Sequence, residues 1–481
     1  MVWTADRRLP EPIDALLRGE EVTQARLACS CGREHSVGLR RIVHRPGALA
    51  TLPQLLDGLG AGSVWVVADE RTDEAAGRRV RTLLARTNRR VTASVLPAEP
   101  PPHPDEPALG RLLLDLPEPG VVLVAVGAGT ITDLARFVAS RLRVPMVAVP
   151  TAASVDGFTS SVAAMIVDGV RVTYSSSPPV AVVADPEVYV RAPARLTASG
   201  WAELAGKWTT LADWVLSAGL NDEYLCPVAV GMVEAAAEPI RQAVSTNGQE
   251  RGAVAWRSPE AVQALMDGLL RVGVAMLMMG NSRPASGSEH HLAHYWEMRD
   301  LLEGRQPSLH GERVGVASAL VQRIYRTLLA TQPSSWPEPA PVDVADHERW
   351  VRQGFGRVAA TLLEEQRAWA DGPWRLFGRG RQDLAARRAQ IERRWDRVVA
   401  SVQPYLLDPE RLAAALHDAG APSSWRAIGL APELVATSLV AAPEVRPRYT
   451  VLHLMRELGM VGPDPGAPGD WVSRWMEAGN R

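Results

Sequence analysis

The stretch Val121-Val-Leu-Val-Ala-Val126-Gly127-Ala-Gly129-Thr130 decides the fold of this 481-residue chain. Six consecutive apolar residues, four of them valine, are typical of a strand that is buried on both faces of a parallel sheet. The two glycines that follow indicate a tight turn, and residues 133–141 have the pattern of a helix. Strand, turn and helix together predict one βα unit of an α/β domain.

Similar short apolar runs surround this unit. We expect further strands at residues 63–68, 91–96, 144–149 and 181–184, with a helix at 78–90. Short apolar strands that alternate with helices predict a doubly wound parallel sheet. One segment differs: residues 163–174 alternate around Asp168-Gly169, which predicts a hairpin with a type I′ turn.

From about Thr197 onward the chain is expected to be helical. The clearest predicted helices cover residues 201–217, 227–244, 259–279, 289–303 and 313–331. An Arg- and Glu-rich stretch at 350–405, with a break near 372–380, predicts an added helical pair. We therefore expect an α/β domain at 1–196, a helical domain at 197–460 with an added segment at about 335–405, and a frayed, flexible tail at 461–481.

Composition excludes several classes of function. A net charge of −2 gives no electrostatic footprint for nucleic acid, and no basic run suggests an anionic membrane. The apolar stretch at 264–280 contains Asp267 and Arg271, so we expect a buried helix instead of a membrane span. The first residues lack the apolar core of a signal peptide, and three cysteines fit a reducing compartment. We expect a cytoplasmic protein.

Cys29-Ser-Cys31-Gly-Arg-Glu-His35 offers two thiols and an imidazole to a metal. A structural zinc site usually has four ligands, and no second cysteine pair follows in the sequence. We therefore interpret this stretch as an N-terminal strand or turn with incidental thiols.

Lys207 is the only lysine, since all the other residues among the 52 basic ones are arginine. Arginine serves equally well in a surface ion pair, but it cannot replace a compact ammonium whose pKa burial can tune. This suggests a functional site around Lys207. The alternative is a helix pair with Glu203 at the i,i+4 spacing.

Two segments favour a phosphate-containing ligand at the carboxyl ends of the strands. The backbone at Gly127 and Gly129 can approach a phosphate, and a helix N-terminus favours negative charge; the alternative is an ordinary tight turn. The segment from Thr151 to Ser161, at the end of a neighbouring strand, is rich in small hydroxyls and contains Asp156. Ligands of open α/β sheets bind at such strand ends.

Four of the ten histidines fall between positions 290 and 310. His290 and His294 share one helix face, and His310 begins another predicted helix. Two imidazoles, a carboxylate and an open position make a catalytic metal site, with Glu203 as the carboxylate candidate. Polar interface histidines are the alternative. Arg283, in a Gly/Ser-rich loop before the histidines, suits a substrate phosphate.

Five segments together carry a resemblance to a known family. They are Gly127–Asp133, Pro150–Ser161, Gly200–Lys207, Ser282–His294 and Leu309–Glu312. They resemble sn-glycerol-1-phosphate dehydrogenases, relatives of iron-containing alcohol dehydrogenases, glycerol dehydrogenases and 3-dehydroquinate synthases. The resemblance spans roughly residues 28–330, with weaker similarity near Arg448. It implies a dehydroquinate synthase-like architecture, in which a Rossmann-like domain precedes an all-α domain and the active site lies between them.

The resemblance also implies a role for each candidate residue. The residues that would line the dinucleotide pyrophosphate are Gly127, Gly129, Thr130 and Asp133. Thr151, Ser154 and Ser160 would flank the ribose and nicotinamide. Asp69 would accept a ribose hydroxyl, which favours NAD(H) over NADP(H).

On the substrate side, the resemblance implies one divalent metal bound by Glu203, His290 and His310. Zinc is expected, with nickel or iron as alternatives. Asp156 would hold a substrate hydroxyl, Arg283 the phosphate, and His294 would orient the substrate or relay a proton. Lys207 would stabilise the carboxylate ligand or the phosphate. By the same analogy the protein would be a homodimer.

One departure keeps alternatives open. The dehydrogenases of this superfamily usually carry Asp where this chain has Glu203, whereas the dehydroquinate synthases use Glu. We expect the metal-dependent reduction of dihydroxyacetone phosphate to sn-glycerol 1-phosphate by NADH. The alternatives are a sugar-phosphate cyclase that uses NAD catalytically, and an inactive binding homologue with residues 335–405 as its interaction surface.

Overall fold

The computed structural model describes residues 7–23, 26–168, 170–245, 255–367, 381–462 and 464–478. They form two compact units. The first unit comprises Met1–Leu204, Cys226–Glu238 and Arg251–Ala285, and the second comprises Ala205–Leu225, Pro239–Glu250 and Ser286–Arg481. Two helices therefore continue from one unit into the other, α8 (Ala194–Asn221) and α9 (Pro227–Ser245). The expected boundary at residue 196 stays a prediction.

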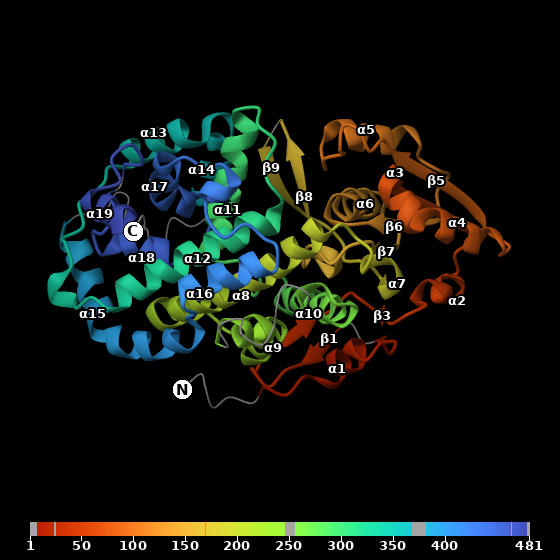
Figure 1. The fold of residues 1–481 in the computed structure, drawn as a ribbon, viewed down its shortest axis with the longest axis horizontal. Helices are drawn as coiled ribbons and strands as arrows, with labels where there is room; N and C mark the ends of the chain where they lie inside the picture. Colours follow the sequence, from red (N-terminus) through yellow and green to blue (C-terminus); the bar gives the residue numbers. More distant parts are fainter. Residues whose placement is uncertain are drawn as a thin grey trace. The chain divides into compact units, whose positions relative to one another are not determined.

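A six-stranded parallel sheet forms the centre of the first unit (Figure 1). Its strands are β3 (Arg41–His44), β4 (Ser63–Asp69), β5 (Arg90–Leu96), β6 (Val121–Gly127), β7 (Met146–Pro150) and β10 (Ala181–Ala184). The strand order is β3-β10-β7-β6-β4-β5, and every neighbouring pair is parallel. The five predicted strands and the parallel α/β class are confirmed.

The strand order creates one special position in the sheet. The chain leaves β4 towards β5 on one side and then returns to the other side of β4 to form β6. Crossover connections on the two sides of such a point run in opposite directions and leave a crevice at the carboxyl ends of the strands. Asp69 ends β4 and Gly127 ends β6, so both residues lie at this topological switch point.

The core explains why the apolar runs form these strands. All seven residues of β6 are buried, as are the five central residues of β4. Helices cover the sheet, because parallel strands need crossover connections. Those of the first part of the chain are α1 (Glu11–Leu17), α2 (Leu52–Gly58), α3 (Glu70–Thr72), α4 (Arg78–Ala85), α5 (Glu106–Leu114), α6 (Gly129–Leu142) and α7 (Pro186–Tyr189).

Two antiparallel hairpins complete the first unit. The predicted hairpin is confirmed as β8 (Val162–Val167) and β9 (Val170–Ser175). Asp168 has a φ of 52°, as a primed turn demands, while Gly169 lies outside the described residues. The second hairpin joins β1 (Arg26–Ala28) to β2 (Glu34–Ser36) around Cys29 and Cys31.

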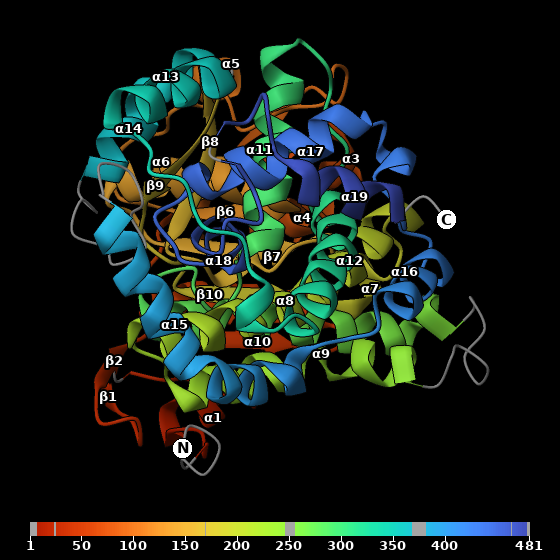
Figure 2. The ribbon, with the colours of Figure 1, turned by 90° about the vertical axis from the view of Figure 1, so that its left-hand side faces the viewer.

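The chain after Ala194 is largely helical, as expected. After α8 and α9 follow α10 (Pro259–Met279), α11 (Ser288–Leu302), α12 (His310–Leu329), α13 (Val344–Phe355), α14 (Ala359–Arg367), α15 (Arg381–Val402), α16 (Pro409–Asp418), α17 (Pro432–Ala441), α18 (Val451–Glu457) and α19 (Asp470–Ala478). Within the second unit, α11 packs against α12 and α17 (Figure 2). The predicted break at 372–380 lies outside the described residues.

Two expectations about single segments have clear outcomes. Helix α10 is long and apolar enough to cross a membrane, but 72% of its apolar window is buried inside the protein, which fits the predicted core helix. The tail was expected to be frayed, yet residues 470–478 form α19. Val472 and Trp475 of this helix are buried, and α19 packs against α17, so burial of an apolar face orders this part of the tail.

Candidate active site

Glu203, His290 and His310 come together in the structure. Each offers one ligand atom, and these atoms lie within 4.8 Å of one another. Glu203 lies on α8. Thr210, two turns further along the same face of this helix, donates a hydrogen bond from its hydroxyl to Glu289, the neighbour of His290, at 2.6 Å. This face of α8 is therefore turned towards the start of α11. The imidazole rings of His290 and His310 have centroids 5.2 Å apart.

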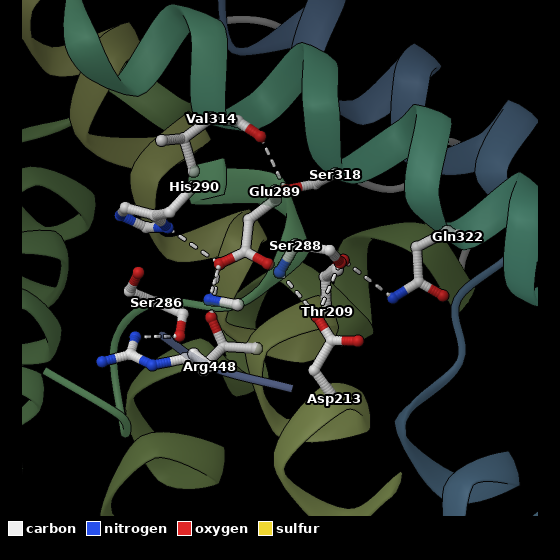
Figure 3. A network of polar contacts seen from close by, with 12 residues as sticks. Thr209, Asp213, Ser286, Ser288, Glu289, His290, Val314, Ser318, Gln322 and Arg448 are labelled. Atoms are coloured by element: carbon white, nitrogen blue, oxygen red, sulfur yellow. Dashed lines mark hydrogen bonds and ion pairs between the residues drawn. The ribbon is translucent and has the colours of Figure 1, made fainter. Parts of the chain in front are cut away.

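His290 is oriented by the residue before it. Oε1 of Glu289 lies 2.8 Å from Nδ1 of His290 and also accepts hydrogen bonds from Thr210 and from the backbone N–H of Gly287 at 2.8 Å (Figure 3). Burial opposes the charge of this carboxylate, but the hydrogen bond and charge of His290 lower the pKa of Glu289. An ionised carboxylate only accepts, so Nδ1 carries the proton and Nε2 keeps its lone pair for a metal.

Asp213 fixes the start of α11, the helix that carries His290 and His294. Its Oδ2 accepts hydrogen bonds from the backbone N–H and the hydroxyl of Ser288, each at 2.6 Å (Figure 3). Its Oδ1 accepts from Tyr325 at 2.7 Å and from the N–H of Val451 at 2.8 Å. Burial, with the nearby charge of Glu289, raises the pKa of Asp213 to about 6. This carboxylate ties α8 to α11, α12 and α18.

Lys207 lies on α8 with no exposed surface. The preceding residue, Gly206, packs so closely on α12 that a Cβ there would lie 2.7 Å from a side-chain carbon of Val314. A buried ammonium is costly unless it is neutralised or solvated by protein groups. Glu203, one helical turn away, is also buried, and its i,i+4 pair with Lys207 stays a prediction. His294, also buried, has its ring centroid 5.8 Å from that of His290 and 5.3 Å from that of His310.

The predicted cofactor residues lie at the carboxyl edge of the sheet. Ala128 is the N-cap of α6, and Gly129 and Thr130 begin the helix. The first N–H groups of a helix have no acceptor within it, so they face the switch point as donors for an anion. A Cβ on Gly129 would meet only Val155, at 3.6 Å, whereas one on Gly127 would lie 2.4 Å from Cβ of Ile131. Gly127 is therefore required by packing and Gly129 is not.

Asp69 and Asp133 already have partners within their own helices. Oδ1 of Asp69 accepts from the N–H of Thr72 at 2.8 Å and caps α3, while Oδ2 has no hydrogen bond among the described residues. Asp133 accepts from Arg136 at 2.8 Å. Arg136 in turn donates to the carbonyls of Gly157 at 2.6 Å and Phe158 at 3.0 Å, so this pair positions the loop that follows β7.

That loop carries the other predicted ligands. Thr151, Ser154 and Ser160 are buried, and Asp156 is half-buried. Two glycines on helices let the loop come close: a Cβ on Gly200 of α8 would lie 2.0 Å from the carbonyl oxygen of Ala153. A Cβ on Gly273 of α10 would lie 2.0 Å from the hydroxyl of Thr159. The loop is therefore a packed element with a defined conformation.

Arg283 lies buried in the loop between α10 and α11, and its backbone N–H donates to the side chain of Asn281 at 2.8 Å. Further along this loop, the guanidinium of Arg448 donates to the carbonyl of Ser286 at 2.5 Å (Figure 3). Arg448 belongs to the segment whose resemblance to the family is weak. Its hydrogen bond fixes the end of the loop that leads into α11.

Three residues that shape this site were not predicted from the sequence: Asp213, Glu289 and Arg448. Glu289 could have been found, because a carboxylate next to a ligand histidine is a common orienting partner. Asp213 and Arg448 gave no local signal, since their partners lie 75 and 162 residues away in the sequence.

The fold is that of a known class of proteins. The family model described as iron-containing alcohol dehydrogenase matches residues 43–193. The crystal structure of glycerol dehydrogenase from Schizosaccharomyces pombe covers 91% of both chains with a TM-score of 0.56 at 15% identity. Alcohol dehydrogenase from Oenococcus oeni covers 91% of this chain and 97% of its own with a TM-score of 0.53 at 14% identity. These similarities establish the fold of this class, with its α/β and helical parts.

Sequence relatives narrow the class. Glycerol-1-phosphate dehydrogenase [NAD(P)+] of Geobacillus stearothermophilus is 31% identical over 443 residues, which are 91% of this chain and 98% of that protein. The enzyme of the same name from Halalkalibacterium halodurans is 37% identical over 301 residues, 62% of this chain and 74% of its own. The chain therefore belongs to the glycerol-1-phosphate dehydrogenase family, whose members are NAD(P)-dependent oxidoreductases.

Proposed function

We propose that this protein catalyses the reversible, NAD(P)H-linked reduction of dihydroxyacetone phosphate to sn-glycerol 1-phosphate. The observation that carries the proposal is the set formed by Glu203, His290 and His310, with ligand atoms within 4.8 Å of one another. One carboxylate and two neutral imidazoles, with room for substrate, are the donors of a catalytic divalent-metal site. The substrate and the dinucleotide are inferred from the family to which the chain belongs.

The residues present fit both groups that the reaction needs. Glu289 presents Nε2 of His290 as a ligand, and the start of α6 offers N–H groups to a pyrophosphate. When bound, a divalent cation polarises the substrate carbonyl and the nicotinamide supplies or accepts a hydride. We propose zinc as the cation, with nickel or iron as the alternatives.

The chain's own residues bind and orient the reactants. Arg283 grips the phosphate through its forked guanidinium, and Asp156 accepts a hydrogen bond from a substrate hydroxyl. His294, whose ring neighbours those of His290 and His310, delivers the proton to the C2 oxygen during reduction and removes it in the reverse direction. Lys207 places a positive charge beside the carboxylate ligand or the phosphate.

The cofactor residues are assigned in the same way. Gly127, Gly129, Thr130 and the backbone at Asp133 line the pyrophosphate, and Thr151, Ser154 and Ser160 flank the ribose and nicotinamide. Oδ2 of Asp69 accepts a ribose hydroxyl at the switch point and repels a 2′-phosphate, so the preferred cofactor is NAD(H). We further propose a cytoplasmic homodimer, in keeping with the three free thiols and with family analogy.

The test follows two products at once. Metal-reconstituted protein is mixed with dihydroxyacetone phosphate and NADH, and NADH oxidation and inorganic phosphate are measured together. Metal-dependent NADH loss without phosphate release is expected. Phosphate release without net NADH loss would assign the protein to the sugar-phosphate cyclases, which carry a glutamate at the position of Glu203. If neither NADH oxidation nor phosphate release is observed although NADH and metal are bound, the protein is an inactive homologue that only binds its ligands.

A further inference from the structure

A second cluster of side chains that can bind a metal lies within the first unit. It consists of Cys29, Cys31, His35 and Cys226, whose ligand atoms all lie within 4.8 Å of one another. The chain contains only three cysteines in 481 residues, and all three are in this cluster. Cys226 is 197 residues from Cys29 in the sequence, yet the fold brings its thiol to the same imidazole as the other two.

The distances match the edges of a coordination tetrahedron. Zn–S bonds of about 2.3 Å and Zn–N bonds of about 2.0 Å at tetrahedral angles give edges of about 3.8 Å for S···S and about 3.5 Å for S···N. In the structure, Sγ of Cys29 lies 3.9 Å from Sγ of Cys226. Nε2 of His35 lies 3.3 Å from Sγ of Cys31 and 3.6 Å from Sγ of Cys226. Cys29 and Cys226 do not form a disulfide, whose sulfurs would lie about 2.05 Å apart.

The far side of the imidazole fixes which nitrogen faces the sulfurs. Nδ1 of His35 lies 2.7 Å from the carbonyl oxygen of Met278, in the last turn of α10. Carbonyls in the last turn of a helix have no partner within the helix and can only accept. Nδ1 therefore carries the proton, and Nε2 directs its lone pair at the three sulfurs. An orienting bond of this kind is typical of metal-ligating histidines.

The backbone around the first two cysteines is folded into a tight turn. The N–H of Gly32 donates to the carbonyl of Cys29 at 3.0 Å, and the N–H of Cys29 donates to the carbonyl of Arg33 at 3.2 Å. Gly32 has a φ of 83°, in the left-handed region that favours glycine. The turn between β1 and β2 thus presents both thiols on one side. Cys226 immediately precedes α9 and supplies the fourth donor from a distant part of the chain.

We propose that Cys29, Cys31, His35 and Cys226 bind a structural zinc ion. Three thiolates and one imidazole complete a tetrahedron with no open position, so the site is structural and not catalytic. Binding converts three thiols to thiolates and releases their three protons. The ion joins the β1–β2 turn to the start of α9, and the hydrogen bond from His35 to Met278 connects the site to the end of α10. The thiols were interpreted as incidental because no second cysteine pair follows in the sequence. In the structure a single distant cysteine, Cys226, together with His35, completes a set of four donors.

The soft thiolates separate this site from the Glu203 set, whose donors are oxygen and nitrogen. Full-length protein, purified under reducing conditions, is analysed for metal per chain in three forms: wild type, Cys226→Ser, and Glu203→Ala/His290→Ala/His310→Ala. We expect the triple variant to keep one zinc ion that Cys226→Ser loses. The exposed His417→Asn is the control and keeps the wild-type metal content. A triple variant without zinc would overturn the proposal.

A measurement on the wild type covers the case in which Cys226→Ser does not fold. A mercurial that reacts with thiols is titrated into the protein while a chromophoric chelator reports released zinc. We expect one zinc ion to leave as three thiols react, and cobalt-substituted protein to show thiolate-to-cobalt charge-transfer absorption. Three freely reactive thiols with no metal release, or a Cys29–Cys226 disulfide found by mass spectrometry, would overturn the proposal.

Discussion

Glu289 accepts a hydrogen bond from Nδ1 of His290 at 2.8 Å, and the two residues are adjacent on α11. The same carboxylate oxygen holds the hydroxyl of Thr210 and the backbone N–H of Gly287. One buried charge therefore sets the tautomer of His290, a proposed metal ligand, and fixes the start of α11 against α8. In the proposed metal site Glu289 is a positioning residue, and its effect can be measured as a change in metal affinity.

Replacing Glu289 by Gln should weaken metal binding while leaving the protein folded. The amide oxygen can still accept hydrogen bonds, but the negative charge that makes His290 a better ligand is lost. Loss of such an orienting partner typically lowers metal affinity by about 10- to 100-fold. The measurement is the metal concentration that restores half of the activity of chelated enzyme. Glu303→Gln, at the exposed end of α11, should leave that concentration unchanged.

Gly127 and Gly129 should respond differently to alanine. A Cβ on Gly127 would lie 2.4 Å from Cβ of Ile131, so Gly127→Ala must displace α6 and should destabilise the protein by about 1–3 kcal/mol. A Cβ on Gly129 would lie 3.6 Å from Val155, an ordinary contact. Gly129→Ala should therefore keep its stability in urea and lose affinity for NADH, because a phosphate can no longer approach the backbone.

Fluorescence titration with NADH and urea unfolding separate the two effects. If Gly129→Ala binds NADH as tightly as the wild type, the start of α6 does not hold the pyrophosphate. If both variants lose only stability, the glycine turn serves packing alone.

The parts of this fold that could be predicted from the sequence are those with a strong local pattern. β6 was predicted because all its residues are apolar and buried. β3 was missed because Arg41 and His44 leave only two apolar residues between them. α19 was missed because the Gly- and Pro-rich residues before it suggested a frayed end, while its stability comes from burying Val472 and Trp475.

The site followed the same rule. His290 and His310 could be proposed as ligands because histidines are concentrated in one short stretch, and Glu203 was proposed because it lies near the single lysine. Partners joined only by the tertiary fold gave no signal. Cys226 approaches His35 across 191 residues of sequence, and a single cysteine carries no spacing pattern.

Glu444 should make the protein sensitive to acid. It lies buried between Arg456, at 2.7 Å, and His347, at 3.2 Å. Burial alone would raise its pKa, but the charges of His347 and Arg456 lower the pKa of Glu444 well below its usual range. A carboxyl with a lowered folded pKa adds stability above its unfolded pKa of about 4.3, and that stability is lost as the pH falls further.

The free energy of unfolding in urea should therefore fall more steeply below about pH 4.3 in the wild type than in Glu444→Gln. At neutral pH the variant should be less stable by about 3–5 kcal/mol, because Arg456 keeps a buried charge without its counter-ion. Glu433→Gln, an exposed change in α17, should follow the wild-type curve. Parallel curves for the wild type and Glu444→Gln would show that another group governs the acid sensitivity.

Lys207→Arg should lower kcat/KM by at least about tenfold. This is the order of magnitude expected when one well-placed charge interaction with the reacting groups is lost. Lys207 is fully buried on α8, so the larger planar guanidinium cannot take its place without shifting its neighbours. The control is Arg241→Lys, the opposite exchange at an exposed arginine whose guanidinium lies 4.9 Å from the centroid of the Trp208 ring. Steady-state kinetics with dihydroxyacetone phosphate, together with urea unfolding, compare the two. If Lys207→Arg keeps full activity, any cation suffices at this position and the single lysine of the chain has no role that arginine cannot fill.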